Sequence, residues 1–260
     1  MGFIKNFIYF LIIILDRIWP KKAIPVLLYH SISDDGSRLS VNKKNFEKQL
    51  NFLSKNGYQS MGPDELYQCL NQGQVPNKKI IITFDDGYQD NYTQALPILK
   101  KYNFSAIIFI ATKFIGQKAS FATDKINQDK KILDFNEIKD LAEEGIIISN
   151  HFHSHLPLTG LNKEQITNEY HTAQNILKNF NHRNIHPEIV AYPKNRVNQE
   201  IINCLKNLNV LLGFSGSNKA INKSDFRLNL SRIEIYQSDS ILKFSAKLTA
   251  YYSLFKIKKL

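Results

Sequence analysis

Two adjacent carboxylates stand at the end of an apolar run in the segment IITFDDGY, residues 81–88. Residues 81–84 have the composition of a buried strand, and Asp85 and Asp86 follow directly. Two neighbouring negative charges repel each other, and burial penalises both. A bound cation would relieve that cost. Since neighbouring side chains point apart, one carboxylate could bind a metal while the other reaches a water molecule. Alternatively, Asp85 only caps the next helix.

A histidine cluster, NHFHSH, occupies residues 150–155. In a helical turn, the spacing of four between His151 and His155 puts two imidazoles on one face, where they can share a metal ion. In a straight strand, His151, His153 and His155 would align instead. The Leu-Pro pair that follows favours an end of the strand before this point. Two histidines and one carboxylate, with open positions, form the ligand set of a hydrolytic zinc site.

Apolar segments rich in β-branched residues alternate with helical patterns along the chain. We expect strands at 24–29, 80–84, 106–111, 146–149, 189–192, 210–214 and 232–235. We expect helices at 45–55, 92–102, 136–144, 163–179 and 198–208. This alternation predicts βαβ units and an α/β fold, a distorted, incomplete (β/α) barrel of about seven parallel strands. The polar, lysine-rich stretch 116–134 is expected to be a surface loop that contributes little to the core.

Chemically active residues follow several of the expected strands. In barrels of this kind, functional residues lie at the carboxyl ends of the strands, which share one rim. The pattern therefore predicts a single site. Its members would be Asp85, Asp86, His151, His30, Tyr192 and Pro193.

At these positions the chain resembles the polysaccharide deacetylases, also called carbohydrate esterase family 4 or the NodB-homology domain. The segment TFDDG at 83–87 matches the first motif of that family, and NHFHSH at 150–155 is similar to its second. The segments IPVLLYHSIS, NFEKQLNFLSKNGY, ALPILKKY, AYP and LSRIEI come in the family's order. The resemblance runs from residue 24 to residue 235.

The resemblance implies a role for each residue. Asp85 would be the general base, while Asp86, His151 and His155 would bind one divalent metal ion, expected to be Zn²⁺. The backbone N–H of Tyr192 would help to bind the oxyanion. The substrate would contact Tyr88, Tyr192, Pro193 and Arg232.

A general acid must protonate the departing amine. The family's usual C-terminal L-x-H histidine is missing, because no histidine follows His186. His30 ends the first strand instead, so the chain is similar to the permuted subset, the poly-N-acetylglucosamine deacetylases, and we expect His30 to be the acid. The chain departs from the family at Phe152, where Ser or Thr is usual, and in its third motif, which lacks the glycine. Ala191 replaces an arginine that orients the base in many members, and Arg232 is a candidate for that role.

The chain is basic, with 34 Lys and Arg against 23 Asp and Glu, a net charge of +11. Either a generally basic surface or an anionic partner such as lipid accounts for this charge. No zinc-finger, helix-turn-helix or RNA-binding pattern occurs, so we expect no nucleic-acid partner. Cys69 and Cys204 form no CxxC and are expected to be small buried hydrophobes.

The N-terminal segment is apolar without interruption over residues 7–15, FIYFLIIIL, and no small-residue cleavage site follows. We expect residues 1–22 to form a membrane anchor or an interfacial helix, with a buried helix as the alternative. Residues 23–237 would form the deacetylase domain. Residues 238–260 would form a basic amphipathic helix, on the same membrane surface or packed on the domain. We expect a bacterial inner membrane, and the flanking charge slightly favours its cytoplasmic face.

These patterns predict a metal-dependent hydrolase that removes N-acetyl groups from an amino sugar. The substrate would be an N-acetylated polysaccharide or a lipid-linked glycan. Removal of a formyl or other small acyl group is one alternative, and a catalytically silent glycan-binding scaffold is another.

Overall fold

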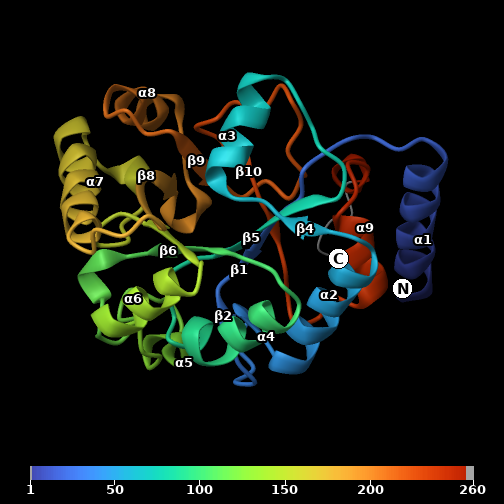
Figure 1. Cartoon of the computed structure of the whole chain (residues 1–260), viewed down its shortest axis with the longest axis horizontal. Coiled ribbons are helices and arrows are strands. Elements are labelled where there is room, and N and C mark those ends of the chain that lie inside the picture. Colours follow the sequence, from blue (N-terminus) through green and yellow to red (C-terminus); the bar gives the residue numbers. More distant parts are fainter. Residues whose placement is uncertain (1, 256–260) are drawn as a thin grey trace.

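The structure, a computed structural model, describes residues 2–255 and the side chains of residues 4–255. Its centre is a sheet of parallel strands in the order β10-β9-β8-β7-β6-β5-β1-β11 (Figure 1). These strands are β1 (Val26–Tyr29), β5 (Lys79–Phe84), β6 (Ile107–Ile110), β7 (Ile147–Asn150), β8 (Ile185–Ala191), β9 (Leu212–Ser215), β10 (Leu230–Ser231) and β11 (Ile233–Glu234). Three shorter strands lie off this path: β2 (Ser31–Ile32) and β3 (Ser40–Val41) pair with each other, and β4 (Gln59–Ser60) pairs with β5.

The two end strands of the sheet are consecutive in the chain, separated by Arg232 alone. Leu230 of β10 pairs with Phe214 of β9, and Ile233 of β11 pairs with Leu27 of β1. The sheet therefore closes through a split last strand. The predicted distorted barrel of about seven parallel strands is confirmed, with eight strand segments along the path.

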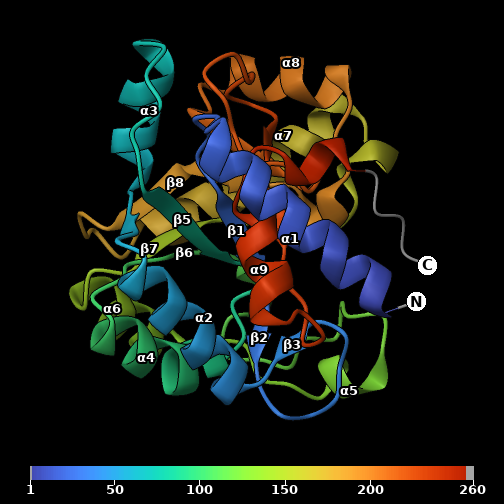
Figure 2. The ribbon, with the colours of Figure 1, turned by 90° about the vertical axis from the view of Figure 1, so that its right-hand side faces the viewer.

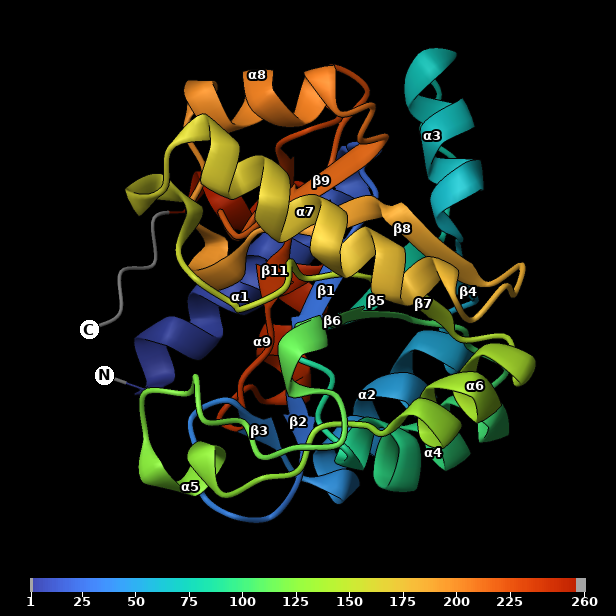
Figure 3. The ribbon, with the colours of Figure 1, turned by 90° about the vertical axis from the view of Figure 1, so that its left-hand side faces the viewer.

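Helices surround the barrel (Figures 1 and 3). They are α1 (Gly2–Ile18), α2 (Lys43–Lys55), α3 (Pro63–Asn71), α4 (Leu96–Lys101), α5 (Lys125–Gln128), α6 (Phe135–Glu143), α7 (Lys163–Lys178), α8 (Gln199–Asn207) and α9 (Ile241–Lys247). Side-chain caps start several of them: Asp134 forms a capping box with Glu137 at α6, and Asn162 forms one with Gln165 at α7.

The strands are buried on both faces, as parallel strands covered by helices must be. Successive residues enter different hydrophobic clusters: Ile81 and Ile107 belong to one, and Ile82 and Ile108 to the other. This follows from the period of two in a strand. Near-continuous apolar runs, rather than alternating ones, were therefore the signal for these strands.

Residues 116–134 contribute more than predicted. Ala119 and Ile132 are buried, and Asn127 Nδ2 donates to Ser37 Oγ at 2.7 Å. Lys130 Nζ lies 2.5 Å from Asp35 Oδ2. The expectation of a loop with little core is therefore wrong. The polar side chains of this stretch bind the segment between β2 and β3, and α5 lies beside that segment (Figure 3).

The N-terminal helix α1 lies against α9 on one flank of the molecule (Figure 2). Tyr9 and Ile12 are buried against Ala246 and Tyr251. Within residues 2–255, no helix reaches the length and apolar character needed to cross a membrane. The outward face of α1 nevertheless exposes Ile4, Phe7 and Phe10 by more than half. Of the predicted C-terminal helix, α9 packs on the domain, and residues 256–260 lie outside the described residues.

Candidate active site

The turn after β5 separates the two carboxylates. The N–H of Asp85 still donates to Tyr29 O at 3.0 Å, as the next rung of the parallel pairing. Asp86 then adopts a left-handed conformation with φ 74°. Gly87 follows at φ 78°, where a Cβ would lie 3.1 Å from Cγ1 of Ile110. The chain reverses so sharply that the two carboxylates meet different partners.

Asp85 is held by a buried guanidinium. Nη1 and Nη2 of Arg232 lie 2.6 and 2.7 Å from the two carboxylate oxygens, a bidentate pair. Nη2 also donates to Asn195 Oδ1 at 3.0 Å, and Nε donates to Ser215 O at 3.2 Å. Arg232 is fully buried. Its side chain therefore positions Asp85, and the predicted contact between Arg232 and substrate is not borne out.

Charge keeps Asp85 ionised. Burial acts to raise the pKa of Asp85, but the Arg232 guanidinium and the nearby His151 outweigh it, so that the pKa is lowered. Each carboxylate oxygen has two lone pairs, so an oxygen that accepts one guanidinium N–H can still accept another proton.

Asp86 faces two imidazoles. Its Oδ1 lies 3.1 Å from Nε2 of His155 and 3.5 Å from Nε2 of His151. Ligand atoms of these three residues all lie within 4.8 Å of one another. Burial acts to raise the pKa of Asp86, but His155 and His151 hold it well below its usual value.

The hydrogen bonds of His151 indicate what this cluster can bind. Nδ1 of His151 lies 2.8 Å from Ala191 O, and since a carbonyl only accepts, Nδ1 carries the hydrogen. Nε2 then presents a lone pair to Asp86, an arrangement that only a proton or a metal ion can bridge. Two ligands of one tetrahedral Zn²⁺, each about 2.0–2.1 Å from the ion, lie about 3.3 Å apart. The separations between Asp86 and the two histidines therefore fit one such ion, and the carbonyl bond of His151 is the usual outer support of a metal-binding histidine.

The histidine turn is neither the straight strand nor the regular helical turn that the spacing suggested. Phe152 and His155 both have positive φ, 63° and 57°. The N–H of Phe152 donates to Asn150 Oδ1 at 2.7 Å, and the phenyl ring is buried in the cluster beneath α7 and α8. Where the family has a hydroxyl, this chain thus fixes the turn with an amide and an apolar anchor.

Glu169, on α7, also holds this turn and was missed by sequence reasoning. Its Oε2 accepts the N–H groups of His153 and Ser154 at 3.1 and 2.8 Å, and its Oε1 accepts the Ser154 hydroxyl. The imidazole of His153 points to Thr112 Oγ1, 3.0 Å away, rather than to the metal cluster. No short sequence motif includes Glu169, because it lies on α7, well after His155 in the chain. It reaches the turn only when α7 packs against the barrel.

Two aromatic residues border the cluster. The ring of Phe121, in the stretch 116–134, lies 4.3 Å from the ring of His155, centroid to centroid. Tyr88 is fully buried, so a direct contact between Tyr88 and substrate is not borne out. Burial and the negative charge of Asp86 raise the pKa of its phenol strongly.

The predicted role of Tyr192 needs correction. Its N–H donates to Phe214 O at 3.0 Å in the pairing of β8 with β9, so it is not available to an oxyanion. Its hydroxyl donates to Leu228 O at 2.5 Å, and the ring is fully buried. Pro193 is buried as well. These residues support the turn that carries Asn195, rather than contacting substrate.

His30 follows β1 and is half-buried at the same rim. Because Tyr29 pairs with Phe84, His30 and Asp85 follow paired residues of two neighbouring strands. Its carbonyl accepts from Asn91 Nδ2 at 2.8 Å. The structure thus brings together Asp85, Asp86, His151, His155 and His30.

Comparisons with known proteins identify relatives of this chain. The family model for polysaccharide deacetylases matches residues 72–212. YxkH of Bacillus subtilis, a protein named as a polysaccharide deacetylase, is 34% identical over 86% of this chain and 75% of its own length. The poly-beta-1,6-N-acetyl-D-glucosamine N-deacetylase of Staphylococcus aureus is 25% identical over 86% of this chain and 72% of its own.

Solved structures show the same fold. The Streptococcus pyogenes deacetylase PplD, in complex with acetate, superposes with a TM-score of 0.75 at 26% identity, covering 87% of this chain and 98% of that one. IcaB from Ammonifex degensii has a TM-score of 0.75 at 20% identity, covering 88% and 97%. With the motifs, the barrel and these relatives in agreement, the chain belongs to the polysaccharide deacetylase family, whose members hydrolyse N-acetyl amide bonds of carbohydrates.

Proposed function

We propose that this chain is a metal-dependent N-deacetylase that acts on an amino sugar of a polysaccharide or lipid-linked glycan. The observation that carries the proposal is the different pairing of two adjacent buried carboxylates: Asp85 with a guanidinium, Asp86 with two imidazoles. Asp86, His151 and His155 would hold a divalent ion, with Zn²⁺ as the best fit to the donor set. When bound, such an ion polarises the acetamide carbonyl and lowers the pKa of a water molecule.

Proton transfers fall to the other two residues. Asp85, ionised and held by Arg232, accepts a proton from the water that attacks the acetamide carbon. His30, on the neighbouring strand end, donates a proton to the departing amine. A free amino sugar and acetate result.

The backbone N–H group that would bind the oxyanion differs from the one predicted from the sequence. In place of Tyr192, we propose the N–H of Lys194, which follows Pro193 at a left-handed φ of 56°. Among the hydrogen bonds of residues 2–255, this N–H has no acceptor. Its turn is tied to the base through Asn195 and Arg232.

Two alternatives differ in what they require of the site. A silent glycan-binding scaffold gains nothing from three buried ligands that face one another, since burying charged groups costs stability. A deformylase would use the same residues, and one methyl group in a pocket changes selectivity only about 10–200-fold. Measuring whether acetate or formate is released distinguishes the deacetylase from the deformylase.

The exposed apolar face of α1 supports membrane contact. Ile4, Phe7 and Phe10 point outward, and Trp19 at the end of the helix is 64% exposed. With Lys21 and Lys22 next to it, α1 is suited to lie in the interface of an anionic bilayer. Cosedimentation with phosphatidylglycerol vesicles tests this. Binding that survives a Phe7→Ser/Phe10→Ser double variant would contradict it.

The reaction is tested by acetate release from N-acetylated oligosaccharides by the zinc-loaded enzyme. Asp85→Asn should lower turnover by about 10²–10⁴-fold while zinc stays bound, whereas His151→Ala should lose zinc and activity together. Loss of zinc from Asp85→Asn would contradict the proposal that Asp86 binds the metal while Asp85 transfers the proton. Unchanged turnover in His30→Ala would remove His30 from the mechanism.

A further inference from the structure

The two histidines of the metal cluster are supported in different ways. Nδ1 of His151 donates to Ala191 O at 2.8 Å. Nδ1 of His155 is also buried, but among the described residues it has no hydrogen-bond partner. A histidine that binds a metal ion through Nε2 normally donates its other N–H to a carboxylate, a carbonyl or a water molecule. His155 therefore lacks the hydrogen bond that usually orients such a ligand.

The orientation of the His155 ring matters for metal binding. Its Nε2 faces Asp86 Oδ1 at 3.1 Å, so Nε2 is the nitrogen that can bind an ion. A neutral imidazole that binds through Nε2 carries its hydrogen on Nδ1, and that hydrogen finds no acceptor among the described residues. The orientation of this imidazole must therefore come from packing.

The ring of Phe121 provides this packing. The rings of Phe121 and His155 lie 4.3 Å apart, centroid to centroid, and are tilted by 43°. The face of an aromatic ring carries a negative electrostatic potential, which favours an imidazole that becomes more positive when it binds a cation. The contact thus restricts the imidazole and also favours its metal-bound form.

Phe121 is itself fixed by its neighbours. Its ring lies 4.7 Å from that of Phe114, centroid to centroid. It packs on a buried cluster that comprises Tyr88, Ala111, Phe114, Ala119 and Ile132. Tyr88 stands two residues after Asp86 in the chain, so this one cluster adjoins two of the three predicted metal ligands.

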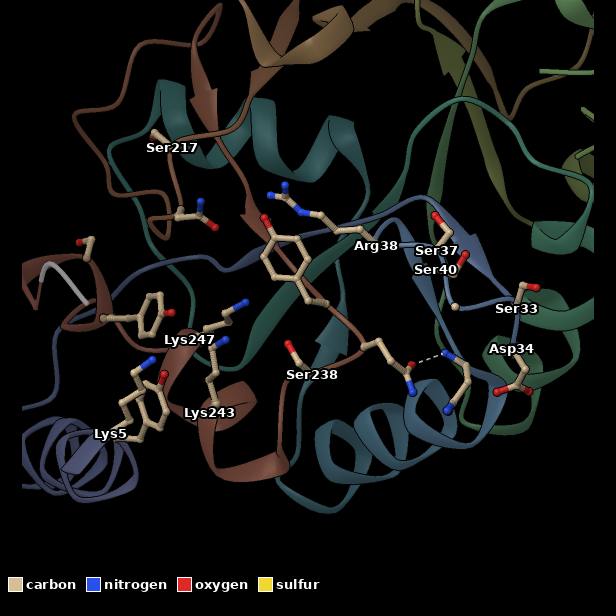
Figure 4. Close-up of a pocket in the computed structure, with 18 of the residues that line it drawn as sticks. Lys5, Ser33, Asp34, Ser37, Arg38, Ser40, Ser217, Ser238, Lys243 and Lys247 are labelled. Atoms are coloured by element: carbon tan, nitrogen blue, oxygen red, sulfur yellow. Dashed lines mark hydrogen bonds between the residues drawn. The ribbon is translucent and has the colours of Figure 1, made fainter. Parts of the chain in front are cut away.

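The stretch 116–134, which carries Phe121, is also anchored to a second part of the barrel. Nδ2 of Asn127 donates to Ser37 Oγ at 2.7 Å, and Nζ of Lys130 donates to Ser40 Oγ at 2.8 Å. Both serines line a cavity beside α9, where Figure 4 shows them next to each other. These bonds tie the stretch to the β2–β3 segment, so Phe121 is carried by a fixed part of the fold.

We propose that Phe121 is a positioning residue of the metal site: its ring orients the imidazole of His155 for metal binding. Phe152 supplies no hydroxyl to the histidine turn, and Phe121 adds a contact that the residues of the turn do not provide. The inference rests on the proposed function, because it requires that His155 binds the catalytic ion. It extends the metal site to a stretch that lies outside both sequence motifs.

Zinc affinity of the full chain, measured by competition with a chelating dye, tests the inference. Phe121→Leu should bind zinc about tenfold or more weakly than the parent, as is typical when a residue that orients a metal ligand is lost. Phe121→Tyr keeps the ring and should bind zinc as the parent does. Phe121→Met keeps most of the side-chain volume without a ring, so it should weaken binding as Phe121→Leu does, and it replaces that variant if Phe121→Leu does not fold.

The matched control is Phe135→Leu, on α6. Phe135 also belongs to an aromatic pair, with its ring 5.7 Å from that of Phe180, centroid to centroid, and it is partly exposed. Its loss should leave zinc affinity unchanged. Circular dichroism spectra of the metal-free variants should match that of the parent, so that weaker binding reflects the site and not unfolding. The KM for substrate, measured at saturating zinc, should not change in Phe121→Leu, because the ring acts on the ligand and not on the substrate.

Several results would overturn the inference. Unchanged zinc affinity in Phe121→Leu and Phe121→Met would show that His155 does not depend on the ring. Equal weakening in Phe121→Tyr would mean that the ring is not the feature that matters, and equal weakening in Phe135→Leu would mean that any loss of an aromatic pair loosens the site. A raised KM with unchanged zinc affinity would assign Phe121 to the substrate instead.

Acetate release is measured separately from zinc affinity. Zinc binding without acetate release in the parent counts against the proposed function only. Unchanged zinc affinity in Phe121→Leu, in an enzyme that does release acetate, counts against this inference only.

Discussion

Asp85 and Asp86 are neighbours and are equally buried, at 3% and 4% exposure, yet their surroundings differ in kind. Asp85 meets the permanent charge of Arg232. Among the described contacts, the only ionisable bases that touch Asp86 are the imidazoles of His151 and His155. The fold itself neutralises one carboxylate, whereas the other depends on a proton or a bound ion.

This difference supports the two functions proposed for the dipeptide. A carboxylate neutralised by a guanidinium keeps its position whether or not metal is bound, as a general base requires. A carboxylate set against two imidazoles, which carry no permanent charge, leaves its own charge for a proton or an ion to balance. Substitutions at the Asp85–Arg232 pair should therefore mainly change folding stability, whereas substitutions at Asp86 should mainly change metal binding.

The largest effect is expected at Arg232. Arg232→Met leaves Asp85 buried without its cation, and breaking a buried pair in this way costs about 3–5 kcal/mol. The free energy of unfolding, measured in urea without metal, should fall by that amount. The double variant Asp85→Asn/Arg232→Met should recover part of the loss, because no unpaired charge remains. A loss below about 1 kcal/mol in the single variant would show that Asp85 does not depend on the guanidinium.

The corresponding change at the second carboxylate is Asp86→Asn. Without metal, this variant should lose less stability than Arg232→Met does, because it removes the favourable pairing of Asp86 with two imidazoles but leaves no permanent cation without a partner. In the parent, Zn²⁺ at 100 times its Kd should add about 2.7 kcal/mol to the free energy of unfolding. Asp86→Asn should lose most of that increment. An equal zinc-induced gain in the variant would exclude Asp86 as a ligand.

Next in size is the support from α7. Glu169→Ala removes the acceptor for two N–H groups and one hydroxyl of the turn that carries His155. Residues that orient metal ligands typically change metal affinity about 10–100-fold when mutated. Zinc affinity, measured by competition with a chelating dye, should fall in that range. Glu164→Ala, at an exposed position on the same helix, is the control and should leave affinity unchanged.

The sequence predicted the barrel and the ligand trio because both depend on local signals. Long β-branched runs identify strands buried on both faces; Asp86 and His151 stand at the ends of such strands, and His155 lies in the turn that follows β7. Elements with weaker periodicity were missed, among them α3 and the two-residue strand β10. The short polar helix α5 was missed as well, within a stretch that instead binds the β2–β3 segment.

The supporting residues could not be read from local patterns. Glu169 and Phe121 reach His155 only after α7 and the stretch 116–134 have packed. Tyr192 stood at the expected strand end, but pairing of β8 with β9 engages its N–H. Arg232 was considered both for orienting the base and for contacting substrate. Its complete burial at the split strand decides between them, and burial is a property of the closed barrel.

A third carboxylate, Asp35, tests whether burial is what makes these pairs strong. Its Oδ2 lies 2.5 Å from Lys130 Nζ and its Oδ1 accepts the N–H of Ser37, but its side chain remains 21% exposed. Partial burial acts to raise the pKa of Asp35, and the bonds from Lys130 and Ser37 outweigh it and lower the pKa to about 2. A depressed pKa stabilises the fold above the ordinary value of 3.8, and that contribution is lost as the pH falls toward 2.

Asp35→Asn should therefore lower the free energy of unfolding at neutral pH by about 1 kcal/mol, as expected for a partly solvated pair. It should also flatten the slope of that free energy between about pH 4 and pH 2, since the unfolded chain no longer takes up an extra proton there. Lys130→Met should flatten the same slope, because Asp35 then titrates nearer its ordinary pKa. Urea unfolding at several pH values measures both effects. A slope as steep as that of the parent in Asp35→Asn would mean that other carboxylates carry the acid sensitivity. A loss as large as that at Arg232 would mean that exposure does not weaken the pair.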